Sequence, residues 1–211
     1  MSTVPQTVTI SSSFGAGGNV VGPAVAEHLG IPFFDRAIPT TVASRLAITL
    51  EDATAQGEKA PPTWARLTRA FANMAVPMSA QDLGSPGDPD QFRSETERIL
   101  HQIADSTGGV VLGRGAMVIL GNQPGVLRVR LDGDIDARIA RVAEIEKIDL
   151  DAARVMQRDT DGARDRYLRL FYRVRQDDFT LYDLVIDTTE IPFETCTELI
   201  VLAAKAKSAA R

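Results

Sequence analysis

The chain has 211 residues, of which 44% are hydrophobic and 24% are charged, and its net charge is −5. These values are ordinary for a folded globular protein and exclude a disordered, collagen-like or disulfide-rich chain. The negative charge argues against a protein that coats duplex nucleic acid, and no apolar stretch is long enough for a membrane span. A single cysteine, Cys196, excludes an intrachain disulfide. The N-terminus carries no signal-peptide pattern, so we expect a cytoplasmic protein of one domain.

The N-terminal segment predicts a βαβ unit. Apolar and β-branched residues first alternate with period two, then recur at helical spacing, and then form a short apolar run that ends at Asp35. The expected elements are a strand at 7–11, a turn of small residues at 12–18, a helix at 18–29 and a strand at 31–34. A glycine and a proline after the helix provide its stop signal.

The segment that follows differs in composition. A helical pattern covers 37–50, after which 51–92 is rich in proline and glycine, with a short helix expected around 64–74. Residues 51–92 are too few to bury a core of their own. We therefore predict one domain, 1–211, that carries a mobile insertion at about 51–92.

The rest of the chain alternates helices with strands. The expected elements are a helix from Asp88-Pro89, a strand at 110–112, a strand at 126–131, a helix opened by 132–134, a helix at 150–174 broken or kinked near Gly162, a strand at 184–186 and a helix from about Pro192. This alternation predicts an α/β fold with an open, mostly parallel five-stranded sheet and helices on both faces. Ligands bind such sheets beyond the carboxyl ends of the strands, so we expect one crevice to be shared by the loops at 12–18, 35–36, 113–114 and 188.

The turn at 12–18 is the first candidate site. Backbone N–H groups at a helix N-terminus favour an anion. In the P-loop pattern G-x-x-x-x-G-K-[ST], Gly17 fits the second glycine and Ser12 replaces the first, while Gly18 replaces the lysine and Asn19 the magnesium-binding hydroxyl. A tight turn without a ligand is the simpler alternative.

A dinucleotide-binding fingerprint, G-x-G-x-x-G, is the competing interpretation. Gly15 and Gly17 fit it, whereas Val20 occupies the third position. Asp35 lies 20 residues past Gly15, a suitable place for an acid that binds ribose. The residues alone leave both interpretations open.

Arginine is unusually concentrated in the second half of the chain. Of 19 arginines, 11 lie between Arg128 and Arg175. They could form ordinary helical ion pairs, or a few of them could clamp a phosphorylated ligand, since arginine recognises phosphate through two parallel hydrogen bonds. Asp161 and Arg164 are three residues apart on one helix face, so they form either a surface pair or an acid for a sugar or base beside an arginine for phosphate. Arg114, between two glycines after a buried strand, lies either over the crevice or on the surface.

Taken together, these segments resemble the cytidylate kinase-like family of P-loop nucleoside monophosphate kinases. The resemblance rests on segments that occur in order along the chain: Val8-Thr9-Ile10-Ser11, Phe14-Gly15-Ala16-Gly17-Gly18, Leu29-Gly30-Ile31-Pro32-Phe33-Phe34-Asp35-Arg36, Val110-Val111-Leu112-Gly113-Arg114, Asp161-x-x-Arg164-x-x-Tyr167 and Tyr182-Asp183-Leu184-Val185-Ile186-Asp187-Thr188. It implies a fold of the P-loop NTPase type. It also implies transfer of the γ-phosphoryl of ATP to CMP or dCMP, with Mg²⁺, so the expected partners are small nucleotides.

The resemblance also implies roles for individual residues. An arginine-rich lid would cover about 134–160. The ATP phosphates would be held by Ser13, Phe14, Gly15, Ala16, Gly17, Gly18 and Asn19. The monophosphate substrate would be bound by Asp35, Arg36, Arg114, Asp161 and Arg164. The expected catalytic residues are Arg114, Arg158 and Arg164, and no protein ligand for the metal is predicted.

The chain departs from the family pattern at Gly18, Asn19, Arg36 and Leu112, where cytidylate kinases carry lysine, a hydroxyl residue, a small hydroxyl residue and aspartate. The lysine and the hydroxyl stabilise the transferring group and hold magnesium. Three hypotheses therefore stand: a phosphotransferase acting on a pyrimidine monophosphate, a nucleotide-binding regulatory or scaffolding module without turnover, and a dinucleotide-binding oxidoreductase.

Overall fold

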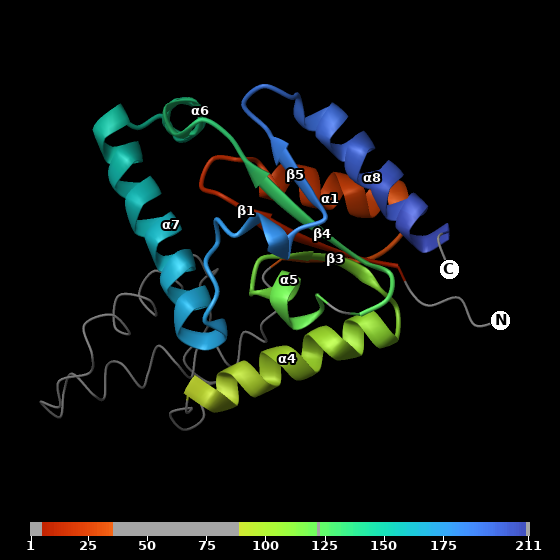
Figure 1. The fold of residues 1–211 in the computed structure, drawn as a ribbon. Helices are drawn as coiled ribbons and strands as arrows, with labels where there is room; N and C mark the ends of the chain where they lie inside the picture. Colours follow the sequence, from red (N-terminus) through yellow and green to blue (C-terminus); the bar gives the residue numbers. More distant parts are fainter. Residues whose placement is uncertain (1–5, 36–88, 122, 210–211) are drawn as a thin grey trace, which may run out of the picture.

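The computed structural model describes residues 6–35, 89–121 and 123–209 (Figure 1). The strands are β1 (Thr7–Ser12), β2 (Phe33–Asp35), β3 (Gly109–Leu112), β4 (Val126–Asp132) and β5 (Leu184–Asp187). The helices are α1 (Gly18–Leu29), α4 (Pro89–Asp105), α5 (Ala116–Ile119), α6 (Ile135–Glu146), α7 (Leu150–Tyr172) and α8 (Phe193–Ala209), with a 3-10 turn, η2, at Phe179–Leu181. No helix in these ranges combines the length and the apolar character that crossing a membrane requires.

The five strands form one parallel sheet in the order β2-β3-β1-β4-β5. In a dinucleotide-binding fold the second strand lies directly beside the first, which brings its terminal acid next to the glycine-rich turn. Here β3 lies between them: Val8 pairs with Val110, and Phe33 pairs with Val110 from the other side. The strand order therefore removes the oxidoreductase hypothesis.

Helices cover both faces of the sheet (Figure 1). On one face α1 and α8 pack together over β1 and β4, where Val8 and Ile10 meet Val21, Val25 and Ile200 in one buried cluster. On the other face α4 and α5 bury a second cluster built around Leu100, Val111, Leu120 and Val126. The predicted architecture, an open parallel five-stranded sheet with helices on both faces, is confirmed.

Two boundaries differ from the sequence prediction. β2 begins at Phe33 and not at Ile31, because the Ile31 N–H is used to cap α1: it donates to Ala26 O at 3.1 Å beyond a left-handed Gly30. Of the predicted break or kink in α7 near Gly162, the break is wrong, since the helix runs without interruption from Leu150 to Tyr172. The short helix α5 and the turn η2 were not predicted.

Some predictions fall outside the described residues. These are the helices at 37–50 and 64–74 and most of the insertion at 51–92, of which only 89–92 are described, as the start of α4. The expected start of that helix at Asp88-Pro89 agrees with the observed start at Pro89. The arginine-rich segment at about 134–160 corresponds to α6 and the first half of α7.

Candidate functional site

Several backbone N–H groups in the loop between β1 and α1 have no hydrogen-bond acceptor among the described residues. Gly17, with φ +76°, is the N-cap of α1, and Ala16 N–H donates to Ser13 O within the loop. The N–H groups of Gly15, Gly17, Gly18 and Asn19 find no hydrogen-bond acceptor in the part of the chain that the structure describes. Free N–H groups at the N-terminus of a twelve-residue helix constitute an anion-binding arrangement.

Three arginines hold the same loop from its carbonyl side. Arg164 Nη1, from α7, donates to Ser12 O at 2.8 Å. Arg138 Nη1 and Arg141 Nη1, both from α6, donate to Phe14 O at 2.7 Å and Gly15 O at 2.9 Å. We call Arg138, Arg141 and Arg164 the arginine clamp. Because the arginine clamp donates hydrogen bonds to the carbonyl oxygens of the loop, it favours a loop conformation in which the backbone N–H groups point away from the clamp.

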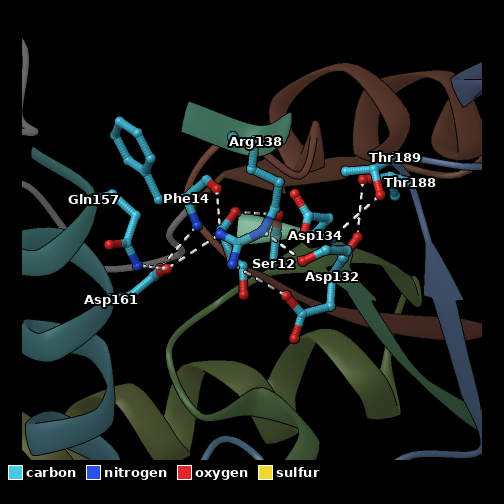
Figure 2. Close-up of polar contacts among 12 residues, drawn as sticks. Ser12, Phe14, Asp132, Asp134, Arg138, Gln157, Asp161, Thr188 and Thr189 are labelled. Atoms are coloured by element: carbon cyan, nitrogen blue, oxygen red, sulfur yellow. Dashed lines mark hydrogen bonds and ion pairs between the residues drawn. The ribbon is translucent and has the colours of Figure 1, made fainter. Parts of the chain in front are cut away.

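Asp161 joins the clamp to the loop (Figure 2). Its carboxylate accepts from Phe14 N–H at 2.8 Å and from Gln157 Nε2 at 3.0 Å. It also pairs with Arg138 at 3.3 Å and with Arg164 at 3.4 Å. Asp161 and Arg164 therefore form the expected ion pair. Each of these side chains also forms a hydrogen bond with the backbone of the loop.

Arg130 lies beneath the loop and was not among the predicted site residues. This buried guanidinium, from β4, donates to Ser13 Oγ at 2.6 Å and to Ser11 Oγ at 3.3 Å. It also pairs with Asp132 at 3.0 Å. The available sequence signal was the presence of two arginines, Arg128 and Arg130, in an apolar strand, which is uncommon in a sheet covered on both faces.

The charged groups alternate in sign from the sheet to α7. Asp132 pairs with Arg130 and, at 3.6 Å, with Arg138, which pairs in turn with Asp161 and so with Arg164. Figure 2 shows Arg138 between Asp132 and Asp161 at the centre of this arrangement. Arg130, Arg138 and Arg164 are thus each balanced by a carboxylate.

Arg141 differs from the other arginines at the loop. Its Nη2 donates to Thr188 O at 2.7 Å, and its guanidinium lies 4.7 Å from the centroid of the Phe193 ring. Within the described ranges it has no carboxylate partner, and only two of its five N–H donors are used. Arg141 therefore joins the loop to the end of β5, and among the described residues its charge is unbalanced and three of its N–H donors are unused.

The other predicted residues occupy different places. Asp35 is exposed at the end of β2, and β3 separates it from the loop. Arg114 is half-buried and has a left-handed backbone conformation, φ +60°. Burial raises the pKa of the Tyr167 phenol, and the positive charge of Arg114 nearby offsets part of that rise. Arg158 is exposed on α7, with no hydrogen bond or ion pair to the described residues. Arg36 lies outside the described residues.

Two of the segments predicted to share a crevice lie close to β1 or to the loop that follows it. Gly113 N–H donates to Ile10 O at 2.8 Å, which places the start of the Arg114 loop beside β1. Thr188 is tied to the loop through Arg141 and to Asp132 O through its own N–H and hydroxyl groups.

The described residues contain no cluster of three or more histidine, cysteine, aspartate or glutamate side chains that could hold a metal ion.

Comparison with known proteins places the chain within a family. The model of the cytidylate kinase-like family matches residues 7–190. The chain is 24% identical over 202 residues to a cytidylate kinase of Archaeoglobus fulgidus, and the match covers 95% of each protein. It is also 29% identical over 109 residues, 52% of its length, to a uronate isomerase of Corynebacterium glutamicum, of which it spans only 21%.

One solved structure resembles this chain in fold over most of its length. An uncharacterized protein from Eubacterium ventriosum aligns with a TM-score of 0.66 at 21% identity, over 95% of this chain and 98% of that one. At this identity the likeness concerns the fold, and it agrees with the sheet order and helix placement described above.

Proposed function

Because the chain belongs to the cytidylate kinase-like family, with residues 7–190 matching the family model, we propose that it is a nucleotide phosphotransferase. The reaction is transfer of the γ-phosphoryl group of ATP to a pyrimidine nucleoside monophosphate, CMP or dCMP. An oxygen of the monophosphate attacks the γ-phosphorus, and the bond from that phosphorus to the ADP oxygen breaks. The observation that carries the proposal is the loop with four N–H groups that have no acceptor among the described residues, held on its carbonyl side by the arginine clamp.

The ATP phosphates would lie against that loop. The N–H groups of Gly15, Gly17, Gly18 and Asn19 would donate to phosphate oxygens, while Ser13, Phe14 and Ala16 shape the turn. Arg141 would supply positive charge, since it is unbalanced and has three N–H donors available among the described groups. Donors that are already in place need no reorganisation when charge develops on the transferring group.

The monophosphate would be bound on the β3 side of the crevice, with Arg114 as its principal cation and Asp35 and Arg36 nearby. Arg158, exposed on α7, would reach the transferring group if α6 and α7 close over the nucleotides as a lid. Asp161 and Arg164 would act on the loop, since Asp161 accepts from Phe14 N–H and Arg164 donates to Ser12 O.

The described residues offer no matching set of protein ligands for magnesium. Asn19 stands where a hydroxyl ligand is expected, and the carboxylate of Asp132 is shared between Arg130 and Arg138. Mg²⁺ in nucleotide enzymes often keeps several waters and binds substrate phosphates. We therefore propose that Mg²⁺ reaches this site as the ATP complex, and we assign it no protein ligand.

Release of ADP in a coupled assay with CMP, dCMP, UMP and AMP as acceptors tests the proposal. We expect turnover with CMP or dCMP. The second candidate function, a nucleotide-binding module without turnover, is favoured by the absence of lysine at position 18. It requires that ATP and CMP bind in calorimetric titrations while no ADP is released with any acceptor.

Arg114→Ala tests the monophosphate site. Loss of a charged hydrogen-bond partner costs about 1.5–3 kcal/mol, so we expect roughly 10- to 150-fold weaker CMP binding and little change for ATP. Arg154→Ala, in an exposed pair with Asp136, is the matched control. Wild-type CMP affinity in Arg114→Ala would remove Arg114 from the site.

Asp161→Asn separates the two roles open to Asp161. If it holds the loop, the substitution weakens ATP binding at least as much as CMP binding. If it meets the sugar or base of the acceptor, only CMP binding is weakened.

A further inference from the structure

The side chain of Ser12 fills the space beside Gly18. A Cβ atom added to Gly18 would lie 2.7 Å from Ser12 Cβ, 2.8 Å from Ser12 Oγ and 3.0 Å from Leu112 Cδ1. Gly18 is not among the glycines with positive φ, so its backbone conformation would accept any L-residue. Space alone therefore requires glycine at position 18.

Ser12 cannot easily yield this space. It is the last residue of β1, paired with Leu131 of β4, so its Cβ atom is fixed by the sheet. Its hydroxyl donates to Ser13 O at 3.1 Å, which orients the rest of the side chain. The Leu112 methyl group is the end of a flexible side chain and can move at lower cost.

Positions 12 and 18 are also two places at which the loop departs from the P-loop pattern, which has glycine first and lysine seventh. The structure brings these two departures into contact. We propose that Ser12 determines which residue can occupy position 18. Its side chain excludes any side chain there, lysine included, and so makes this a phosphate loop without a lysine. The phosphate part of this inference rests on the proposed function.

The exclusion has an electrostatic consequence for the bound polyphosphate. Without a lysine at position 18, the cation available at the loop is Arg141, which has no carboxylate partner among the described residues. If glycine replaces Ser12, a lysine at position 18 has room and its ammonium group can contact the phosphates. ATP binding should then depend less on Arg141.

A double-mutant cycle without nucleotide tests the exclusion itself. We expect Gly18→Ala to lower the melting temperature in the wild-type background and to leave it unchanged or raised in the Ser12→Gly background. Ser106→Gly, at an exposed turn after α4, is the control and should combine additively with Gly18→Ala. Additive effects of Ser12→Gly and Gly18→Ala would overturn the proposal.

Calorimetric titration with ATP tests the consequence for the ligand. We expect Gly18→Lys alone to bind ATP no better than wild type, and Ser12→Gly with Gly18→Lys to bind it roughly tenfold more tightly or better. In that double variant, Arg141→Met should weaken ATP binding less than it does in the wild-type background. Equal ATP affinity of Gly18→Lys and of Ser12→Gly with Gly18→Lys would contradict the inference. Absence of ATP binding in every protein would instead reject the proposed function. In that case the double-mutant cycle on melting temperature still tests the steric exclusion.

Discussion

Gly17 is the residue at which the shape of the loop is most constrained. It has a left-handed φ of +76°, and a Cβ atom there would lie 2.3 Å from the Phe193 ring. Phe193 in turn lies under the guanidinium of Arg141. A side chain at position 17 would therefore disturb both α8 and the clamp.

Gly17→Ala should lower stability by more than Gly30→Ala. Both glycines are left-handed, which costs an L-residue about 1–2 kcal/mol, but a Cβ atom on Gly30 meets nothing within 4 Å. Gly17→Ala adds the clash with Phe193 to the same conformational cost. Thermal denaturation of the two variants checks this, and equal losses would show that the ring moves aside freely.

Arg138 is the central residue of the ion-pair arrangement. It donates to Gly133 O at 3.0 Å and to Phe14 O, and it pairs with Asp132 and Asp161, although only 7% of its side chain is exposed. Buried charges of this kind are stable only while their partners remain.

Arg138→Met should cost about 3 kcal/mol of unfolding free energy, because it leaves two carboxylates short of a partner. Arg154→Met, which breaks an exposed pair, should cost less than about 1 kcal/mol. Denaturant titration measures both. Hydrogen exchange at the Phe14 amide should also speed up in Arg138→Met alone, and unchanged exchange there would mean that Asp161 holds the loop without Arg138.

At the scale of elements, Asp183 is the residue just before β5, and its side chain links that strand to β4 and α8. Its carboxylate accepts from the backbone N–H of Arg128 at 2.9 Å and from Arg128 Nη2 at 2.8 Å in β4, and from Lys207 in α8. Burial raises the pKa of Asp183, but the hydrogen bonds from Arg128 and Lys207 outweigh it and hold the pKa well below its usual range. The edge of the sheet thus depends on an ionised carboxylate.

The stability from Asp183 should therefore be lost in acid. Its folded pKa lies below the unfolded value of about 3.9, so its contribution is complete above about pH 5 and disappears as the pH falls through the folded pKa. Asp183→Asn should cost about 1–2 kcal/mol at pH 7 and flatten the acid limb of the stability curve. Asp177→Asn, in an exposed pair with Arg175 that also lowers the pKa of Asp177, is the control; because solvent screens this pair, the substitution should flatten the acid limb much less than Asp183→Asn does. An unaltered acid limb in Asp183→Asn would contradict the assignment.

At the scale of the whole molecule, the sheet is stabilised by two separate cores. The core under α1 and α8 contains much of β1 and β4, while the core under α4 and α5 contains Leu100, Val111 and Leu120. The β1–α1 loop follows directly from β1, and Ala16 in that loop is buried in the first of these cores.

Leu120→Ala should destabilise the protein by about 2–5 kcal/mol, because Leu120 is fully buried in the second core. Leu202→Ala, on the exposed side of α8 with 67% of the residue accessible, should change stability by less than about 0.5 kcal/mol. Denaturant titrations compare the two. A small effect of Leu120→Ala would mean that α4 and α5 contribute little to the fold.

The sequence by itself determined the elements and the direction of the strands. Local periodicity, the glycine-rich turn and the stop at Gly30 follow from neighbouring residues, so the five described strands and the longer described helices could be predicted within a few residues, whereas the four-residue helix α5 could not. The candidate loop at 12–18 could be located for the same reason, because a strand, small residues and a helix N-terminus are local features.

The tertiary structure alone decided how distant residues meet. Phe14 and Asp161 are 147 positions apart, and Arg130 and Ser11 are 119 apart, so no local pattern pairs them. The strand order, which removed the dinucleotide interpretation, depends on β3 entering between β1 and β2. The exclusion between Ser12 and Gly18 needs the exact path of the turn, since residues six apart in a loop touch only when the backbone folds back on itself.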